Sequence, residues 1–229
     1  MDNPITVLIP VGPWPWSTRW LPECLQSVLA QTRQADEILL VDDMAGLDER
    51  AFGLDERTFC RIWRAPWRLG VAGAFNAGVA MAAHDLIIML GADDRLMPQA
   101  LELCEKAYQI RRRDALGYYH MDVEYSDGEQ QNLPCHAAMV TKALWRHTGG
   151  FPPESGIGAP DAAFISVMLA HYGGAGHLYR VESPEPLYWV RRHRYQDTAM
   201  RQVYQRSILE VRDILTSTWQ RPKWGRFVP

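Results

Sequence analysis

The stretch DLIIMLGADDRLMP, Asp85–Pro98, places two adjacent acids shortly after an apolar run. The five consecutive apolar residues Leu86–Leu90 are short and continuous, which is typical of a strand buried on both faces of a sheet. Gly91 and the acids Asp93 and Asp94 follow the run. The stretch therefore predicts a central strand whose carboxyl end presents a pair of carboxylates.

Three roles can be considered for Asp93 and Asp94: a helix cap, a ligand of a metal ion, and a plain turn. Pro98 is expected at the first position of the next helix, which makes Met97 the N-cap and leaves the acids too early to cap it. A hard divalent cation, Mg²⁺ or Mn²⁺, prefers carboxylate oxygens and usually shares its coordination with substrate phosphates. A plain turn is the third possibility, because adjacent aspartates are common in loops.

Strands and helices alternate on the N-terminal side of this stretch. Helical spacing covers Leu21–Leu29 and Val71–Ala83, and the other apolar runs are Ile5–Pro10, Glu37–Val41 and Cys60–Arg64. This order predicts an α/β fold, with a mostly parallel central sheet and helices on both faces. Ligands of such sheets bind beyond the carboxyl ends of the strands. Asp42 and Asp43, which end the second strand, are therefore expected to face the same crevice as Asp93 and Asp94.

The second half of the chain is less regular. A helix is expected as far as Arg113, followed by a strand region over Leu116–Ser126, and Asp161 is expected to begin a later helix. That helix would bury Phe164, Met168, Leu169 and Tyr172, and a terminal helix near 198–219 would bury Tyr204, Ile208, Val211 and Leu215. No linker divides the chain, so 1–229 is predicted to be a single domain.

Composition places the chain in the ordinary globular class. Its 229 residues are 47% hydrophobic and 22% charged, and the net charge of −3 provides no overall attraction to nucleic acid or to an anionic membrane. A basic tail, RPKWGRFVP, together with Arg191, Arg192 and Arg194, leaves nucleic acid as a minor alternative partner. No apolar run is long enough to span a membrane, and no signal peptide is evident.

The four cysteines indicate the compartment. Cys24, Cys60, Cys104 and Cys135 show no CxxC spacing, which argues against a zinc site or a redox pair. Reduced thiols and a cytoplasmic location are expected.

The order of the motifs resembles that of the GT-A glycosyltransferases, specifically the inverting, nucleotide-sugar-dependent enzymes of family 2. The resemblance covers roughly Ile5–Tyr195. It is carried by ITVLIPVG, LPECLQSVLAQT, DEILLVDD, GVAGAFNAGVAMAAHDLIIMLGADD and HAAMVTKALWRHTGGFPPE, then by Asp161 and by RRH at Arg191–His193. It implies that 1–98 binds a nucleotide sugar and that 99–195 binds the acceptor.

The resemblance also assigns roles to single residues. Asp161 falls where the family has its general base, although as an Asp at a helix start it also suits a plain N-cap. Asp94 and His193 fall at metal-binding positions, which implies Mn²⁺ or Mg²⁺. The positions implied for donor binding are Pro10, Asp42, Asp43, Asn76, Asp93 and Arg191. For Asn76, an alanine- and glycine-rich helix packed tightly on the sheet is an equally good explanation.

The implied reaction is transfer of a sugar, most simply from a UDP-sugar, to an acceptor hydroxyl with inversion. The acceptor is open between a glycan, a lipid-linked sugar, a small metabolite and a modified nucleobase. Gly91 stands where the family often has a first acid, and Pro160 where an acid commonly precedes the base. These departures keep a catalytically inactive nucleotide-sugar-binding module as an alternative. A nucleotidyltransferase is a further one, although PVGPWPWSTRW is a poor phosphate loop.

Overall fold

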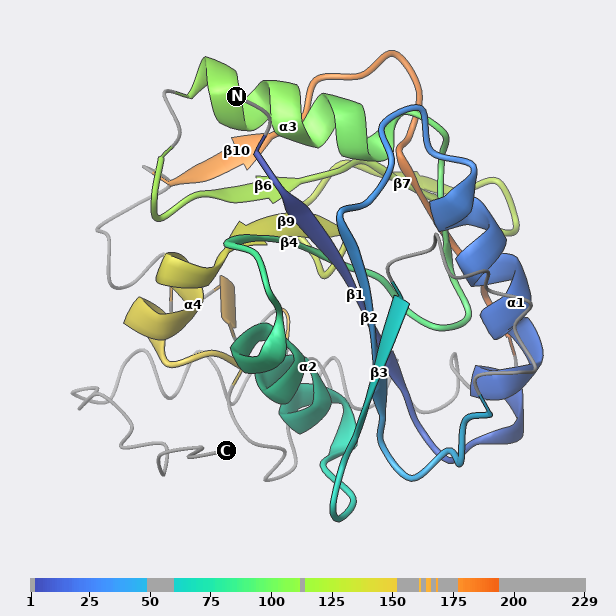
Figure 1. Ribbon diagram of the computed structural model, residues 1–229. Coiled ribbons are helices and arrows are strands. Elements are labelled where there is room, and N and C mark those ends of the chain that lie inside the picture. The colour runs from blue at the N-terminus through green and yellow to red at the C-terminus, as the bar shows by residue number, and fades with distance from the viewer. Residues whose placement is uncertain are drawn as a thin grey trace, which may run out of the picture.

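A sheet of seven strands forms the centre of the computed structural model (Figure 1). The structure describes residues 3–48, 60–111, 114–151, 161, 164, 165, 168 and 177–193. The predicted terminal helix near 198–219, together with Pro160, Leu169 and Tyr172, lies outside the described residues.

The seven strands lie in the order β10-β6-β9-β4-β1-β2-β3. They are β1 (Ile5–Val11), β2 (Glu37–Asp42), β3 (Cys60–Arg64), β4 (Leu86–Met89), β6 (Tyr118–His120), β9 (Ala138–Thr141) and β10 (Leu178–Arg180). All neighbouring strands are parallel except β9, which runs antiparallel to both β4 and β6. The predicted, mostly parallel central sheet is confirmed.

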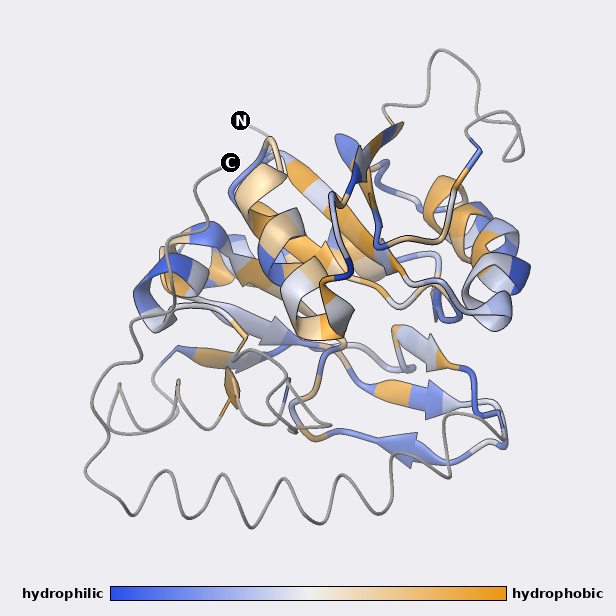
Figure 2. Cartoon of the chain, turned by 90° about the horizontal axis from the view of Figure 1, so that it is seen from below, coloured by the Kyte–Doolittle hydropathy of each residue, from blue (hydrophilic) through white to orange (hydrophobic). Residues whose placement is uncertain are grey.

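Helices cover both faces of this sheet. The helices are α1 (Pro15–Leu29), α2 (Gly70–Met81), α3 (Ala100–Ile110) and α4 (Lys142–Thr148). Because side chains alternate between the faces of a strand, Ile9 and Ile88 pack with α1 and α3, whereas Leu8 and Ile87 pack with α2 and α4. Figure 2 shows hydrophobic residues concentrated in the central strands, and hydrophilic ones on the surrounding helices and outer strands as well as in loops. The central strands β1, β2, β4 and β9 are therefore buried on both faces, whereas the edge strands β3 and β10 are only partly buried.

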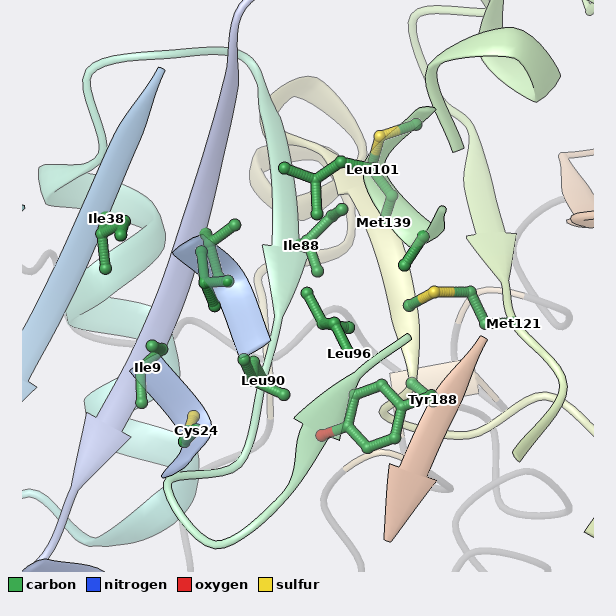
Figure 3. Close-up of a cluster of buried hydrophobic side chains, with 14 of the residues drawn as sticks. Ile9, Cys24, Ile38, Ile88, Leu90, Leu96, Leu101, Met121, Met139 and Tyr188 are labelled. Atoms are coloured by element: carbon green, nitrogen blue, oxygen red, sulfur yellow. The ribbon is translucent and has the colours of Figure 1, made fainter. Parts of the chain in front are cut away.

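A second sheet of four strands lies beside the first, in the order β5-β11-β7-β8. Its strands are β5 (Arg95–Leu96), β7 (Val123–Tyr125), β8 (Gln130–Gln131) and β11 (Tyr188–Val190). Leu96 and Tyr188 of this sheet join Ile88, Leu90 and Met139 in one buried cluster (Figure 3). The predicted strand region Leu116–Ser126 is thus divided between the two sheets, as β6 and β7.

The helix after the acidic pair begins later than the sequence predicts. It starts at Ala100 with Gln99 as N-cap, so Pro98 is not its first residue and the prediction of Met97 as the cap is wrong. The reason is tertiary pairing: Arg95 and Leu96 pair with β11, and the Met97 N–H donates to the Leu187 carbonyl at 2.9 Å. These bonds hold the chain extended as far as Met97, and α3 begins only at Ala100.

The buried carboxylate of Glu37, at the amino end of β2, stabilises the fold. Glu37 is fully buried, and its carboxylate accepts from the Thr6 hydroxyl at 2.7 Å, the Ala83 N–H at 2.8 Å and the Arg61 guanidinium at 2.6 Å. Burial alone would raise the pKa of Glu37, but these hydrogen bonds outweigh it and lower the pKa. Its stabilising contribution is therefore present above the ordinary pKa of 4.5 and is lost as the pH falls through the lowered pKa.

We expect Glu37→Gln to reduce the free energy of unfolding at pH 7 by about 2 kcal/mol, because it breaks a buried charged network. The difference from wild type should shrink as the pH falls below the ordinary glutamate pKa. Urea unfolding at several pH values measures both effects. Glu185→Gln is the matched control, since Glu185 is exposed. An equal stability of the Glu37 variant and wild type at neutral pH would contradict the expectation.

Candidate active site

Asp93 and Asp94 lie in the turn that follows β4, at the carboxyl edge of the sheet. Asp94 is only 3% exposed, and its backbone N–H donates to the Gly91 carbonyl at 3.1 Å. Its Oδ2 accepts from the Tyr188 hydroxyl and its Oδ1 from the Arg191 N–H, both at 3.0 Å. Strand β11 thus fixes the orientation of the Asp94 carboxylate.

Asp93 lies beside a histidine from the end of the described chain. His193 Nε2 is 3.1 Å from Asp93 Oδ2, and the side chains are 11% and 20% exposed. Burial raises the pKa of the Asp93 carboxyl, the charge of Asp94 raises it further, and His193 opposes the shift. Two crowded carboxylates with one imidazole therefore face the same point, which is where the sequence predicted a donor and metal site.

Asp161, which is helical in the structure, approaches this point from the other half of the chain; the residues directly before it lie outside the described ones, so the expected helix start stays a prediction. Its Oδ2 accepts from the backbone N–H of His136 at 3.2 Å. The His136 ring lies between two carboxylates: Nδ1 is 3.5 Å from Asp161 Oδ2, and Nε2 is 3.6 Å from Asp94 Oδ2. The predicted general base and the predicted metal ligand thus contact one imidazole.

The electrostatic state of His136 follows from this position. Burial lowers the pKa of His136, but the carboxylates of Asp161 and Asp94 outweigh it and hold the pKa well above its usual value. His136 was not among the predicted site residues. Its only local signal is a histidine directly before the apolar run AAMV, and only the antiparallel direction of β9 brings that end of the strand to the carboxyl edge of β4.

Tryptophans of the first helix enclose His193. Its ring centroid is 5.0 Å from that of Trp20 and 6.0 Å from that of Trp16. Trp14 stacks on Trp16 at 5.2 Å and is 44% exposed, with the Arg68 guanidinium over its ring at 4.8 Å. The start of α1 and the ring of Trp14 therefore form an aromatic wall beside the acidic pair.

Arg191 is anchored by three contacts. Its Nε donates to the Asp93 carbonyl at 3.0 Å, its Nη2 pairs with Glu23, and its guanidinium lies 4.8 Å from the Trp20 ring centroid. The positive charge is held at the acidic pair with its side chain 18% exposed. Arg191 is thus placed for contact with a negatively charged ligand.

The acids after β2 support loops of the same edge. Asp42 accepts from the N–H groups of Ala45, Gly46 and Leu47 and from Arg64 Nη1, at 2.7, 3.1, 2.9 and 2.8 Å. Asp43 accepts from the N–H groups of Leu69 and Gly70, at 2.5 and 2.9 Å. Both carboxylates are nearly fully buried, and in this structure they stabilise the loops after β2 and before α2.

Pro10 and Asn76 complete the residues that the sequence proposed. Pro10 is half-buried near the carboxyl end of β1, opposite Val41. The Asn76 amide exchanges hydrogen bonds with the backbone of Phe151 at 2.8 and 2.9 Å. Helix α2 also packs closely on the sheet, since a Cβ added to Gly78 would lie 2.2 Å from a methyl carbon of Leu8. In this structure Asn76 therefore braces the segment leading to Phe151.

Comparison with known sequences decides the family. The family model described as Glycosyl transferase family 2 matches residues 18–150. The chain belongs to this family.

Two relatives of this family 2 chain extend well beyond the region that matches it. It is 31% identical over 154 residues to an uncharacterized glycosyltransferase of Nostoc sp., covering 61% of this chain and 46% of that protein. It is 30% identical over 135 residues to the glycosyltransferase GlyG of Streptococcus pneumoniae, covering 56% of this chain and 42% of GlyG. The matches thus span less than half the length of these relatives.

Solved structures share the GT-A fold. S. aureus TarS 1-349 in complex with UDP-GlcNAc has a TM-score of 0.74 at 14% identity, covering 95% of this chain and 68% of that one. The mannosyltransferase PcManGT from Pyrobaculum calidifontis, in complex with GDP-Man and Mn²⁺, has a TM-score of 0.69 at 15% identity, covering 97% and 66%. In the described part of this family 2 chain, no helix has the length and apolar character needed to cross a membrane.

The acidic pair of this family 2 chain suits a divalent cation that substrate phosphates complete. Burial and mutual repulsion raise the pKa of Asp93, and a bound cation would relieve both. Within the described ranges, no group of three or more His, Cys, Asp or Glu side chains is arranged to hold a metal. Mg²⁺ commonly takes only one or two protein carboxylates besides substrate phosphates and water, so a cation held by one or both aspartates would need no third protein ligand.

Gly91, where the family often has an acid, has no room for a side chain. A Cβ at this position would lie 2.6 Å from Asp94 Oδ2 and 3.2 Å from Asp93 Oδ1. Asp94 Oδ2 is held by the Tyr188 hydroxyl, so it cannot move away without losing that bond. The glycine is therefore matched to the position of the Asp94 carboxylate.

We expect Gly91→Asp to weaken metal-dependent nucleotide binding by about tenfold, because the new side chain displaces the Asp94 carboxylate. Calorimetric titration with a nucleoside diphosphate and Mn²⁺ measures the change. Gly91→Ala is the matched variant, since it introduces the same Cβ without the charge and should also weaken binding. Tighter binding by the aspartate variant would show that the missing acid, rather than the packing, limits the site.

Proposed function

We propose that this chain is an inverting glycosyltransferase that moves a sugar from a UDP-sugar to an acceptor hydroxyl. The observation that carries the proposal is the contact of Asp94 and Asp161 with the same imidazole, His136. One carboxylate follows β4 in the donor half, and the other belongs to a helical residue in the acceptor half. A donor diphosphate and an acceptor hydroxyl bound at these two carboxylates would meet between them.

Asp161 is the general base. Its side chain is 19% exposed, so an acceptor hydroxyl can reach it. The acceptor oxygen forms a bond to the anomeric carbon while the bond from that carbon to the diphosphate breaks. Asp161 takes the hydroxyl proton, and the diphosphate leaves with the bonding electron pair. A single displacement of this kind inverts the anomeric configuration.

Asp94 holds the donor side, with Asp93 and His193 beside it. A Mn²⁺ or Mg²⁺ ion bound there would supply Lewis-acid stabilisation of the leaving diphosphate. Arg191 adds positive charge toward the same phosphates, because its guanidinium is fixed at the Asp93 carbonyl. Pro10, Asp42, Asp43 and Asn76 form the nucleoside side of the pocket, directly or through the loops that they brace.

The neighbouring structures support a nucleotide-sugar donor, since TarS is in complex with UDP-GlcNAc and PcManGT with GDP-Man. We assign a UDP-sugar to this chain. The acceptor is a free hydroxyl on a glycan, a lipid-linked sugar, a small metabolite or a modified nucleobase. A cytoplasmic reaction is consistent with the four cysteines, which show no CxxC spacing.

A nucleotide titration combined with a donor-hydrolysis assay tests this function. Thermal shift is measured with UDP, GDP, dTDP and CDP, each with Mn²⁺, with Mg²⁺ and with chelator. We expect stabilisation by UDP that is lost with chelator, and slow release of UDP from UDP-sugars without added acceptor. Binding without any release would identify an inactive nucleotide-sugar-binding module. Absence of binding under every condition would refute the proposed donor site.

A further inference from the structure

His136 joins the two halves of the site through both edges of its ring. Its Nδ1 lies 3.5 Å from Asp161 and its Nε2 lies 3.6 Å from Asp94. These separations are those of ion pairs rather than of short hydrogen bonds. Since Nδ1 and Nε2 lie on different edges of the imidazole, one side chain sets the separation of the two carboxylates.

The backbone around His136 is firmly held. The Cys135 carbonyl accepts from the Tyr118 hydroxyl, and the Ala137 carbonyl accepts from the Met121 N–H at 2.8 Å. Both Tyr118 and Ala137 are fully buried. The N–H of His136, which donates to Asp161, therefore projects from a bend directly before β9 that these hydrogen bonds hold in place.

The ring is fixed as well. It packs edge-on against Tyr188, with centroids 5.4 Å apart and an interplanar angle of 86°. The hydroxyl of that tyrosine donates to Asp94 Oδ2 and accepts from the Gly91 N–H at 2.9 Å. Tyr188 thus ties the His136 ring to the turn that carries the acidic pair.

We propose that His136 is a positioning residue that holds the Asp161 carboxylate at a fixed distance from the Asp94 side of the site. The proposal rests on the proposed function, because it concerns the aim of the general base toward the donor. A base displaced by about 1 Å can cost about 100-fold in rate, so a rigid spacer between base and donor site has a direct catalytic value. His136 itself need not touch either substrate.

The experiment measures kcat and KM for release of UDP from a UDP-sugar, and the affinity for UDP with Mn²⁺. It compares His136→Ala, His136→Gln and wild type. We expect His136→Ala to lower kcat by about 10-fold to 100-fold, with the KM for donor and the UDP Kd little changed. Glutamine, which can still donate to one carboxylate, should recover part of the loss. His147→Ala on α4 is the matched control, because His147 is exposed, and it should behave as wild type.

A double-mutant cycle identifies the residue through which His136 acts. In an Asp161→Asn background, His136→Ala should cause no further loss of kcat, because the base that it positions is already gone. A full additional loss in that background would overturn the proposal. Wild-type kcat in His136→Ala would overturn it too, as would equal losses for alanine and glutamine together with equal falls in Tm.

The proposed transferase function and the positioning role of His136 are refuted by different results. If wild type releases no UDP from any UDP-sugar, the proposed transferase function is wrong, and the positioning role falls with it. If wild type is active and the His136 variants do not show the expected split, only the positioning role is wrong.

Discussion

Asp161→Asn is expected to abolish sugar transfer while leaving nucleotide binding intact. Loss of a general base typically lowers kcat by about 100-fold to 10,000-fold, and asparagine cannot take the acceptor proton. The asparagine carbonyl oxygen can still accept a hydrogen bond from the His136 N–H. In the native chain Asp161 Oδ2 accepts this bond, with 3.2 Å between the nitrogen and the oxygen. The substitution should therefore remove the chemistry and keep the local structure.

Initial rates of UDP release from a saturating UDP-sugar measure this loss, and calorimetry with UDP and Mn²⁺ measures donor-site binding. Asp85→Asn is the matched control, because Asp85 is exposed at the start of β4, at the opposite edge of the sheet. Full transfer activity in the Asp161 variant would remove the proposed mechanism. Loss of UDP binding with a large fall in Tm would instead indicate a mainly structural carboxylate.

Asp94→Asn is expected to weaken metal-dependent nucleotide binding by about 100-fold or more, since replacing even an outer partner of a metal ligand costs about 10-fold to 100-fold. A neutral amide is a poor ligand for a hard cation, which prefers carboxylate oxygens. The amide has one acceptor oxygen, whereas Asp94 accepts from both the Tyr188 hydroxyl and the Arg191 N–H. A lower Tm, corresponding to about 1–3 kcal/mol, should accompany the change.

Titration of UDP with Mn²⁺ and with chelator separates the two effects. The variant and wild type should bind UDP with similar, weak affinity in chelator and differ only with the cation present. Asp85→Asn serves again as the control for loss of one carboxylate. Unchanged affinity with Mn²⁺ would show that Asp94 is not a metal ligand.

Local patterns predicted much of the first half of the fold. Continuous apolar runs such as Leu86–Leu90 correspond to central strands, and α2 covers most of the predicted Val71–Ala83 segment. These features depend on side chains a few residues apart, so they are legible in one sequence. The start of α3 was predicted wrongly because strand pairing with β11, distant in sequence, overrode the local preference of Pro98.

Part of the site was also legible. Asp93 and Asp94 are neighbours in the chain, and the rule that parallel strands present their carboxyl ends together placed them at a ligand edge. Tyr188, which orients Asp94 from 94 residues away, carries no comparable signal. Its contribution depends on β11, a short strand in the second sheet, which no local sequence pattern predicted.

The sequence by itself determined the α/β order of elements, the buried strands and the acidic turn, because these arise from local periodicity and from residues adjacent in the chain. Only the tertiary structure decided that Asp94 and Asp161 share His136. That meeting requires β9 to run antiparallel to β4 and residues 25 positions apart to make contact. Contacts of this kind depend on how distant segments pack, and a single sequence does not encode that packing in any local pattern.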